Sequence, residues 1–108
     1  MATYLVQFTY TPETWATLLQ KPQDRSTPSQ ELVQRLGGKL LGLYYTLGAY
    51  DGIALLEAPD DLTASAVSLA VKASGIMKMN EVTRLFSMDE TLEAMRKANS
   101  GAFSPPRV

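Results

Sequence analysis

The segment from Gly37 to Asp61 constrains the fold more than any other part of this 108-residue chain. It contains two apolar runs, residues 39–46 and 53–58, which are rich in Leu, Ile and Tyr. Between the runs lie Gly48 and Asp51, residue types that tolerate the backbone angles of a chain reversal. The pattern predicts two strands paired as a β-hairpin at the centre of the fold.

The rest of the chain predicts strands and helices arranged around this hairpin. The predicted strands are residues 3–10, 39–46, 53–58 and 78–86. The predicted helical regions are residues 12–36 with a loop in the middle, 62–74, and 88–97. This order predicts an α+β, ferredoxin-like fold, βαββαβ, with a four-stranded antiparallel sheet, helices on one face and an extra C-terminal helix. We expect residues 1–99 to form one domain and residues 100–108 an irregular tail.

Helix ends are marked by residues that satisfy free backbone groups or permit a left-handed turn. The candidate caps and capping boxes are Thr11 with Pro12, Thr27 with Gln30, Asp60 with Asp61, and Ser87 with Glu90. The glycines expected to end helices are Gly37, Gly38 and Gly75.

Two features bear on whether the helices leave room for a pocket. The proline-containing loop from Lys21 to Pro28 is either a flexible lid or an ordinary surface insertion, and the insertion is favoured. Segment 62–74 is rich in Ala and Ser, which predicts close packing on the sheet rather than a wide cavity beneath it. Its predicted buried stripe is Leu62, Ala66, Leu69, Ala70 and Ala73.

Composition excludes several classes of function. The chain has no cysteine and no histidine, which removes disulfides, thiolate catalysis, Ser-His-Asp triads and the usual zinc and haem ligands. We therefore expect no cofactor and no metal. The net charge of -1 offers no basic surface for a phosphate backbone, so nucleic acid is not an expected partner. In RNA-binding domains of this topology the third strand carries stacking rings, whereas residues 51–57 carry none.

The N-terminal residues lack a basic segment followed by a long apolar run, and no apolar stretch of the chain is long enough to span a membrane. We therefore expect a cytoplasmic protein with no membrane partner.

The hairpin strands are apolar at both parities, so both faces of the predicted sheet need cover. One short C-terminal helix is too small to cover a four-stranded sheet. We therefore predict a homo-oligomer, most simply a two-fold dimer with sheets face to face. In that dimer Leu40, Gly42 and Tyr44, or their neighbours of opposite parity, meet the partner.

Tyr50, Asp51 and Arg84 are the candidate catalytic residues. If they converge at a pocket mouth, an Asp-oriented Tyr acts as an acid or hydrogen-bond donor and Arg84 holds a carboxylate or enolate. The structural interpretation is favoured: Gly48 supplies a positive φ, Asp51 bonds backbone amides in the turn, and Tyr50 covers the hairpin. Arg84 then pairs with an acid such as Glu81 or Glu57.

Aromatic side chains with polar tips are numerous for a small domain and could line a site for a flat organic ligand, although core or interface roles are more usual. The candidate ligand-binding residues are Trp15, Tyr44, Tyr45 and Gly48, with Tyr4 and Tyr10 as further aromatic candidates.

Several spaced motifs resemble the GYD domain family. They are Gly37 to Leu40, Tyr45 to Gly48, the Gly-x-Tyr-Asp stretch of Gly48, Tyr50 and Asp51, Glu57 to Asp61, and Thr83 with Arg84. The resemblance extends over roughly residues 3 to 95 and departs in the Lys21–Pro28 loop and in the tail after Asn99. It implies a dimeric α/β-barrel assembly, in which two ferredoxin-like subunits pack sheet against sheet. It implies no activity, because similar folds serve cofactor-free oxygenases, lactone isomerases, haem enzymes and amino-acid-sensing modules.

The sequence therefore favours a homo-oligomeric protein that binds a small molecule or a protein partner. The alternative is a cofactor-independent monooxygenase or isomerase that uses Tyr50, Asp51 and Arg84. A closed pocket of a few hundred Å³ with these groups pointing inward would favour the enzyme. A filled core with the groups held in turn hydrogen bonds would favour the binding role.

Overall fold

The computed structural model describes residues 1–107, in which eight helices and strands follow one another. The strands are β1 (Ala2–Tyr10), β2 (Lys39–Tyr45), β3 (Gly52–Ala58) and β4 (Met77–Leu85). The helices are α1 (Pro12–Gln20), α2 (Ser26–Arg35), α3 (Asp61–Ala73) and α4 (Met88–Asn99). Val108 of the predicted tail lies outside the described residues.

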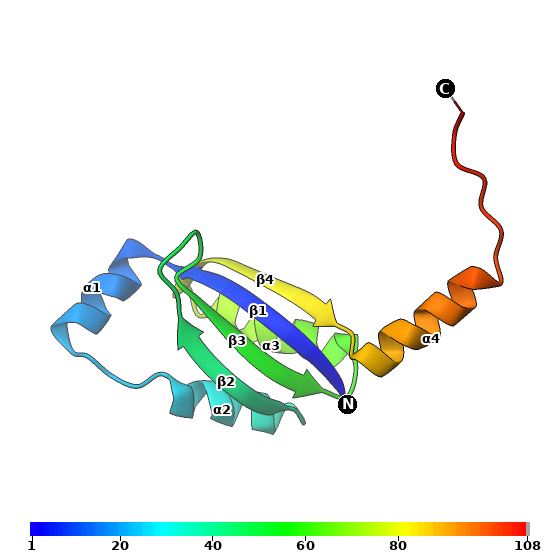
Figure 1. Cartoon of the computed structure of the whole chain (residues 1–108). Coiled ribbons are helices and arrows are strands. Elements are labelled where there is room, and N and C mark those ends of the chain that lie inside the picture. The colour runs from blue at the N-terminus through cyan, green and yellow to red at the C-terminus, as the bar shows by residue number, and fades with distance from the viewer. Residues whose placement is uncertain (108) are drawn as a thin grey trace.

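The strands form one antiparallel sheet in the order β2-β3-β1-β4 (Figure 1). Helices α2 and α3 lie on the same face of this sheet, α2 along β2 and α3 along β4 and β3. The predicted ferredoxin-like, α+β fold is confirmed. No helix among residues 1–107 is long and apolar enough to cross a membrane.

Most predicted helix ends are confirmed. The Oγ1 of Thr11 accepts the Thr14 amide at 3.1 Å, Asp60 accepts the Thr63 amide at 2.8 Å, and Ser87 and Glu90 form a capping box. Gly37 and Gly75 have φ of 94° and 79°, the left-handed region that glycine occupies without strain.

The capping box predicted at Thr27 and Gln30 is wrong. Helix α2 begins at Ser26, and its cap residue Arg25 makes no side-chain capping bond. The carboxylate of Asp24 accepts the Ser26 amide at 2.8 Å, and hydrogen bonds from Ser26 lower the pKa of Asp24. The helix therefore starts one residue earlier, because an acid preceding it already satisfies a free backbone amide.

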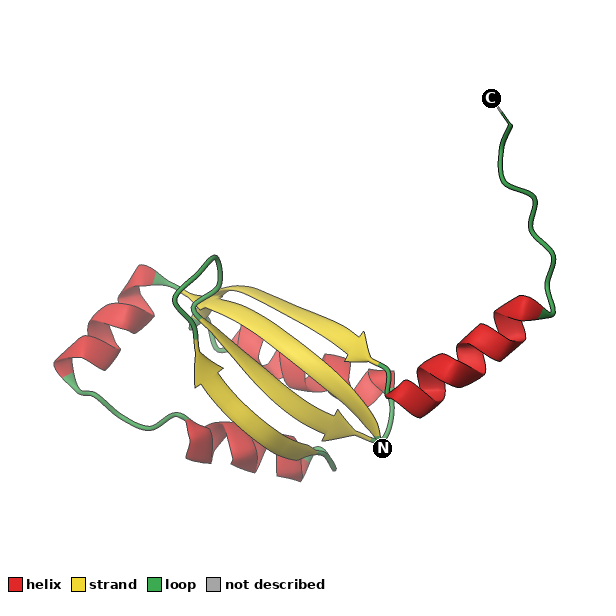
Figure 2. Ribbon diagram, viewed as in Figure 1, coloured by secondary structure: helices red, strands yellow, loops and turns green. Residues whose placement is uncertain are grey.

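Alternate residues of β1 define the two faces of the sheet. Tyr4, Val6, Phe8 and Tyr10 lie on the helix-covered face and are almost fully buried. Tyr4 and Val6 belong to a cluster with buried residues of α2 and α3, which places the core on that face. The opposite face, here called the open face, is covered by no helix among residues 1–107 (Figure 2). The strand register places on it Leu5, Ile53, Leu55, Gly42, Tyr44, Met79 and Leu85.

A one-residue bulge at Leu41 changes the parity of β2. Leu40 pairs with Leu56 on the helix-covered face, whereas Gly42 pairs with Leu55 on the open face. The sequence-based set of Leu40, Gly42 and Tyr44 on one face is therefore wrong for Leu40. An extra residue in one strand of an antiparallel pair shifts every later side chain to the other face.

The buried stripe predicted for α3 is also wrong. Leu62 and Leu69 are 80% and 63% exposed. The side chains of this helix that are buried are Ala64, Val67 and Ser68. Helix α3 has small apolar residues at helical spacing on more than one side, so periodicity alone did not select the buried one.

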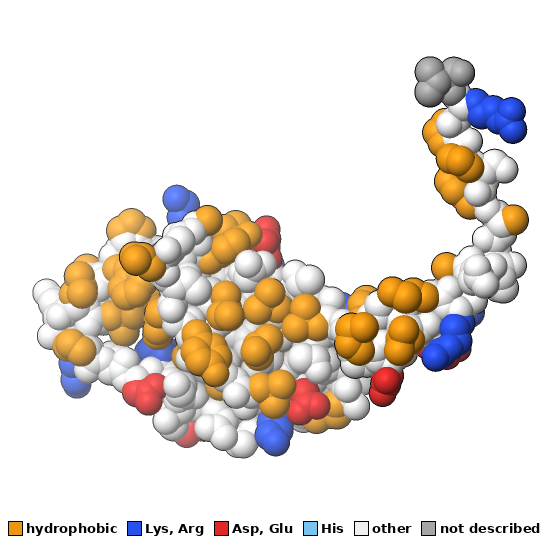
Figure 3. Space-filling model, viewed as in Figure 1, with side chains coloured by type: hydrophobic (Ala, Val, Ile, Leu, Met, Phe, Trp, Pro, Cys, Tyr) orange, Lys and Arg blue, Asp and Glu red, His pale blue; other side chains and the backbone are white. Residues whose placement is uncertain are grey.

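Helix α4 extends away from the sheet as an arm, and residues 100–107 continue it without further helix or strand (Figure 2). The radius of gyration is 17.6 Å, compared with about 13 Å for a compact domain of this length. No residue of α4 is buried. Figure 3 shows hydrophobic side chains along this arm and across the open face.

Candidate functional site

Asp51 joins the hairpin to β1 and α1. Its Oδ2 accepts the backbone N–H of Tyr10 at 2.9 Å and the indole Nε1–H of Trp15 at 3.0 Å. Its own amide donates to the carbonyl of Phe8 at 2.9 Å. The carboxylate therefore fixes the end of β1 and the first turn of α1, and neither of its partners lies in the hairpin turn itself.

Tyr50, the neighbour of Asp51, turns toward β4. Its hydroxyl donates to Glu81 Oε2 at 2.9 Å, and this bond raises the pKa of Tyr50 because the phenolate would face a carboxylate. Glu81 pairs with Gln7 and so lies on the open face. Tyr50 thus connects the hairpin to β4 instead of covering the hairpin.

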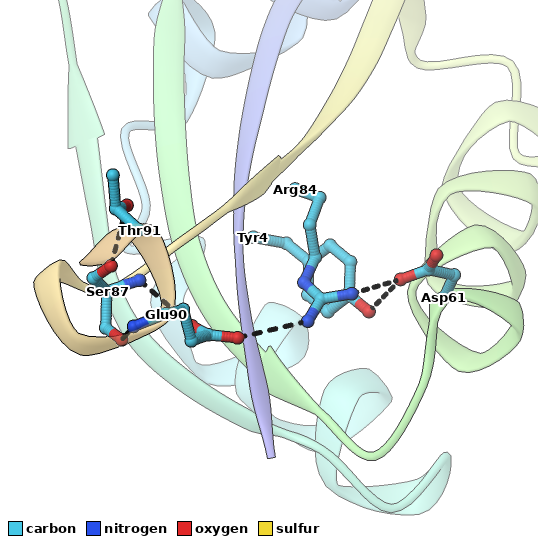
Figure 4. Close-up of polar contacts among 6 residues, drawn as sticks. All are labelled: Tyr4, Asp61, Arg84, Ser87, Glu90 and Thr91. Atoms are coloured by element: carbon cyan, nitrogen blue, oxygen red, sulfur yellow. Dashed lines mark hydrogen bonds and ion pairs between the residues drawn. The ribbon is translucent and has the colours of Figure 1, made fainter. Parts of the chain in front are cut away.

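Arg84 lies in a polar cluster at the other end of β1 (Figure 4). Its guanidinium is 3.3 Å from Asp61 and 3.5 Å from Glu90, and it lies over the ring of Tyr4 at 5.9 Å. The Tyr4 hydroxyl donates to Asp61 at 2.5 Å, which raises the pKa of Tyr4. The expected partners Glu81 and Glu57 are wrong, because Arg84 projects on the helix-covered face whereas those acids lie on the open face.

The three catalytic candidates do not meet within one subunit. Asp51 bonds Tyr10 and Arg84 lies over Tyr4, six residues away along β1, which corresponds to about 20 Å of extended strand. Each candidate is also held by hydrogen bonds or ion pairs to its neighbours. A catalytic role for them stays a prediction.

Two of the ligand-binding candidates lie together and two lie apart. Trp15 and Tyr45 contact Tyr10, with ring centroids 5.2 Å and 6.1 Å away, and the Tyr10 and Tyr45 hydroxyls are 2.9 Å apart. Burial, followed by the bond to Tyr45, raises the pKa of Tyr10. Tyr44 lies on the open face.

Gly48 lies at the hairpin tip, where no atom beyond its two chain neighbours comes within 4 Å of the position a Cβ would take. Its φ is not positive, so the sequence-based reason for a glycine here is wrong.

A cavity of about 270 Å³ lies between α2, α3 and the covered face of the sheet. Its walls are mainly apolar, and none of Tyr50, Asp51 and Arg84 lines it. Helix α3 itself packs on the sheet as expected, because Ala64 and Val67 belong to the buried core, and the cavity lies beside this helix. Helices α2 and α3 lie over different strands, and the short side chains of Ala70 and Ser74 leave the space between them open.

Polar groups of the cavity come from three elements. The Ser68 hydroxyl of α3 donates to Asn80 Oδ1 of β4 at 2.6 Å, and both side chains are buried. Arg25 and Arg35, at the two ends of α2, also line the cavity. The sequence analysis did not select these residues. The available signal was that Ser68 and Asn80 are polar residues on the buried sides of α3 and β4.

The GYD domain family model matches residues 4–95, which is most of the chain and spans nearly all of the four strands. The chain belongs to the GYD domain family.

A curated relative of this GYD protein is the glutamine synthetase and cystathionine beta-lyase binding protein of Thermus thermophilus. The two are 31% identical over 78 residues, which cover 72% of this chain and 82% of the relative. The GYD protein is thus similar over most of its length to a protein named for binding two enzymes.

Solved structures share the fold. TTHA0845 of Thermus thermophilus superposes with a TM-score of 0.54 at 19% identity, over 81% of the GYD chain and 95% of that protein. MtbAldR superposes with a TM-score of 0.58 at 12% identity, over 80% of the GYD chain and 53% of its own length. At these identities the matches show the fold alone.

Proposed function

We propose that this GYD protein is a homo-oligomer that binds a partner protein through helix α4, and that the partner is an enzyme of the glutamine synthetase or cystathionine β-lyase type. The observation that carries the proposal is the exposed apolar stripe on a helix that has no buried residue and is joined to the sheet by the Glu90–Arg84 ion pair of its first turn. Support for the class of partner comes from the Thermus thermophilus relative, which is named for binding those two enzymes.

The stripe is formed by Met88, Leu92 and Met95, which follow one another at spacings of four and three residues. They are 69%, 40% and 57% exposed. Residues so spaced share one side of a helix, the pattern with which amphipathic helices enter grooves of partner proteins. Methionine is flexible and polarisable, which suits a surface that must adapt to another protein.

Residues at both ends of α4 stabilise the helix in the absence of a partner. The capping box at Ser87 and Glu90 satisfies two backbone groups, and acids begin the helix while Arg96 and Lys97 end it, as the helix dipole favours. A helix of 12 residues is nevertheless marginal in water without packing. Contact of the apolar stripe with a partner supplies the stabilisation that the helix lacks alone.

The open face supports the homo-oligomeric part of the proposal. It carries several large apolar side chains, among them Leu5, Leu55 and the 58% exposed Tyr44. Each large apolar side chain removed from water contributes about 1.5 to 3 kcal/mol. A second copy brings the same apolar face, so two sheets packed face to face cover both.

Partner binding is tested with purified glutamine synthetase and cystathionine β-lyase of the same organism, each titrated with this protein in a calorimeter. We expect binding to at least one enzyme, and a loss of about tenfold or more in the Leu92→Glu/Met95→Glu variant because a buried carboxylate is costly. Ala94→Glu adds the same group on another side of α4 and should bind as the unmodified chain does. Binding to neither enzyme, or equal binding by the double variant, would contradict the proposal.

Self-association is tested by light scattering on the unmodified chain and on two neighbouring variants. Tyr44→Lys should give a folded species of the single-chain mass, because Tyr44 lies on the open face. Tyr45→Lys should lower the melting temperature instead, because Tyr45 contacts Phe8, Tyr10 and Trp15. A stable monomer of the unmodified chain would refute the homo-oligomer.

A further inference from the structure

We propose that the cavity between α2, α3 and the sheet binds a small monocarboxylate with an apolar body, whose carboxylate is held by Arg25. The cavity lies on the face of the sheet opposite the proposed oligomer contact, and α4 does not line it. The site therefore goes beyond the proposed binding of a partner protein.

The size and walls of the cavity define the body of the ligand. Its volume of about 270 Å³ corresponds to about nine water molecules at about 30 Å³ each. Val6, Phe8 and Leu56 of the sheet line it, together with Leu32 of α2 and Val67 and Val71 of α3. A ligand of about eight to ten non-hydrogen atoms in all, with an aliphatic or aromatic body, matches this space, and burial of the body is favourable because the walls are apolar.

The charge of the cavity wall defines the head group. Its charged residues are Arg25 and Arg35, and no Asp or Glu is among the described residues that line it. Neither arginine has an ion pair with a carboxylate within residues 1–107, and the Arg25 guanidinium bonds only the neutral Gln23 side chain, at 3.1 Å. A guanidinium beside an apolar cavity is matched by a carboxylate, which it binds through two parallel hydrogen bonds.

Arg25 is the better placed of the two arginines. It is half-buried, whereas Arg35 is exposed at the far end of α2, about 15 Å along the helix axis. Arg25 also lines the adjoining open groove beside α1, together with Tyr10 and Thr14, so it stands where the cavity meets solvent. A ligand with its body in the cavity thus keeps its charged end at the entrance.

The Ser68 and Asn80 pair adds a polar point inside the apolar walls. Asn80 is 8% exposed, and its Nδ2 donates to the sulfur of Met77 at 3.2 Å, a weak acceptor. An amide group has two N–H donors, so a second remains for an oxygen of a ligand. A hydroxyl or keto group on the apolar body is therefore compatible with the site.

The test uses hexanoate and phenylacetate as probes, with the uncharged hexanamide and phenylacetamide as matched controls. Binding to the full chain is followed by methyl NMR of the lining residues Leu32, Val6, Val67 and Val71. We expect saturable shifts of these methyl groups with a carboxylate, and binding at least about tenfold weaker with its amide, because a charge-assisted bond is lost.

Two arginine variants distinguish a specific contact between Arg25 and the carboxylate from a general effect of positive charge near the cavity. Arg25→Ala should weaken carboxylate binding about tenfold or more and leave amide binding unchanged, whereas Arg35→Ala removes the same charge and should change carboxylate binding less than about threefold. Val71→Phe, which fills the cavity, should abolish binding of both probes. Absence of saturable shifts, amides that bind as tightly as acids, or equal effects of the two arginine variants would overturn the proposal.

Discussion

The two faces of the sheet are built from the same strands yet depend on different neighbours. On the covered face Tyr4 is 2% exposed, because it lies in a core cluster with Val33 of α2 and Val67 of α3. Phe8 is also 2% exposed, and the rings of Tyr10 and Tyr45 pack beside it. On the open face Leu5 and Leu55 are half-buried only by adjacent side chains of the sheet, and Tyr44 is largely exposed. The difference teaches that one face stabilises the subunit and the other carries surface that a second molecule can cover.

The largest expected effect distinguishes the adjacent residues Leu56 and Leu55, which lie on opposite faces. Leu56 is 2% exposed, so Leu56→Ala should lower the free energy of unfolding by about 2 to 5 kcal/mol at every protein concentration. Leu55→Ala should act mainly through assembly, so its effect on the melting temperature should depend on protein concentration. Denaturant unfolding at two concentrations checks both, and a concentration-independent loss of equal size in the two variants would contradict the comparison.

The next largest loss of stability should distinguish Asp51 from Tyr50. Asp51 is bonded to Tyr10 and Trp15, whereas Tyr50 is bonded to Glu81 on the open face. Asp51→Ala leaves the Tyr10 amide and the Trp15 indole without their carboxylate and should cost about 2 to 3 kcal/mol. Tyr50→Phe removes one exposed hydrogen bond and should cost less than about 1 kcal/mol. Thermal melts compare them, with the exposed Glu93→Ala as control. Equal melting temperatures for Asp51→Ala and Glu93→Ala would show that Asp51 has no structural role.

Alanine substitutions at two glycines, one on each face of the sheet, should have smaller effects on stability. A Cβ on Gly52 would clash with the ring of the buried Phe8, and one on Gly42 would lie 2.7 Å from the ring of the exposed Tyr44. A Cβ on Gly52 would also lie 2.9 Å from the backbone carbonyl oxygen of Tyr44, which the pairing of β2 with β3 holds in place, so Gly52→Ala should cost about 1 to 3 kcal/mol. Tyr44 can rotate into solvent, so Gly42→Ala should cost less than Gly52→Ala. Denaturant midpoints measure both, and the reverse order would show that the open face is the more tightly packed.

The smallest effect concerns α4, which lies on neither face. The Ser87 amide donates to Glu90, and this bond, with help from Arg84, lowers the pKa of Glu90 below its ordinary 4.5. The carboxylate therefore stabilises the helix above pH 4.5, and this contribution is lost as the pH falls through the lower pKa of the folded chain. The NMR shift of the Ser87 amide should titrate below pH 4.5 and should not titrate in Glu90→Gln. A midpoint above that value would contradict the capping bond.

The sequence predicted the order of strands and helices because each was marked by local chemistry. Period-two alternation in β1 and the caps at Thr11, Asp60 and Ser87 act within a few residues, and all were confirmed. What sequence did not predict depends on contacts between distant segments. The bulge at Leu41 is set by pairing of β2 with β3, and the buried side of α3 is set by its position over β4.

The candidate site was harder to predict for the same reason. Gly48, Tyr50 and Asp51 are close in sequence, but Tyr50 and Asp51 turn to β4 and β1. Arg84 was correctly placed on the last strand, yet strand register decides which end of the sheet it reaches. The cavity has no local signal, because it results from the spacing of two helices that do not adjoin in sequence.

The bulge at Leu41 also affects how this chain should be aligned with others. Residues before it and after it in β2 follow opposite alternations of inward and outward side chains. Consider a relative whose second strand lacks the extra residue. If the gap is placed at residue 38 instead of 41, Lys39 and Leu40 are each matched to a residue of the opposite face. A substitution that conserves the core would then be scored as a change of surface, so comparisons of this family need the gap set at the bulge.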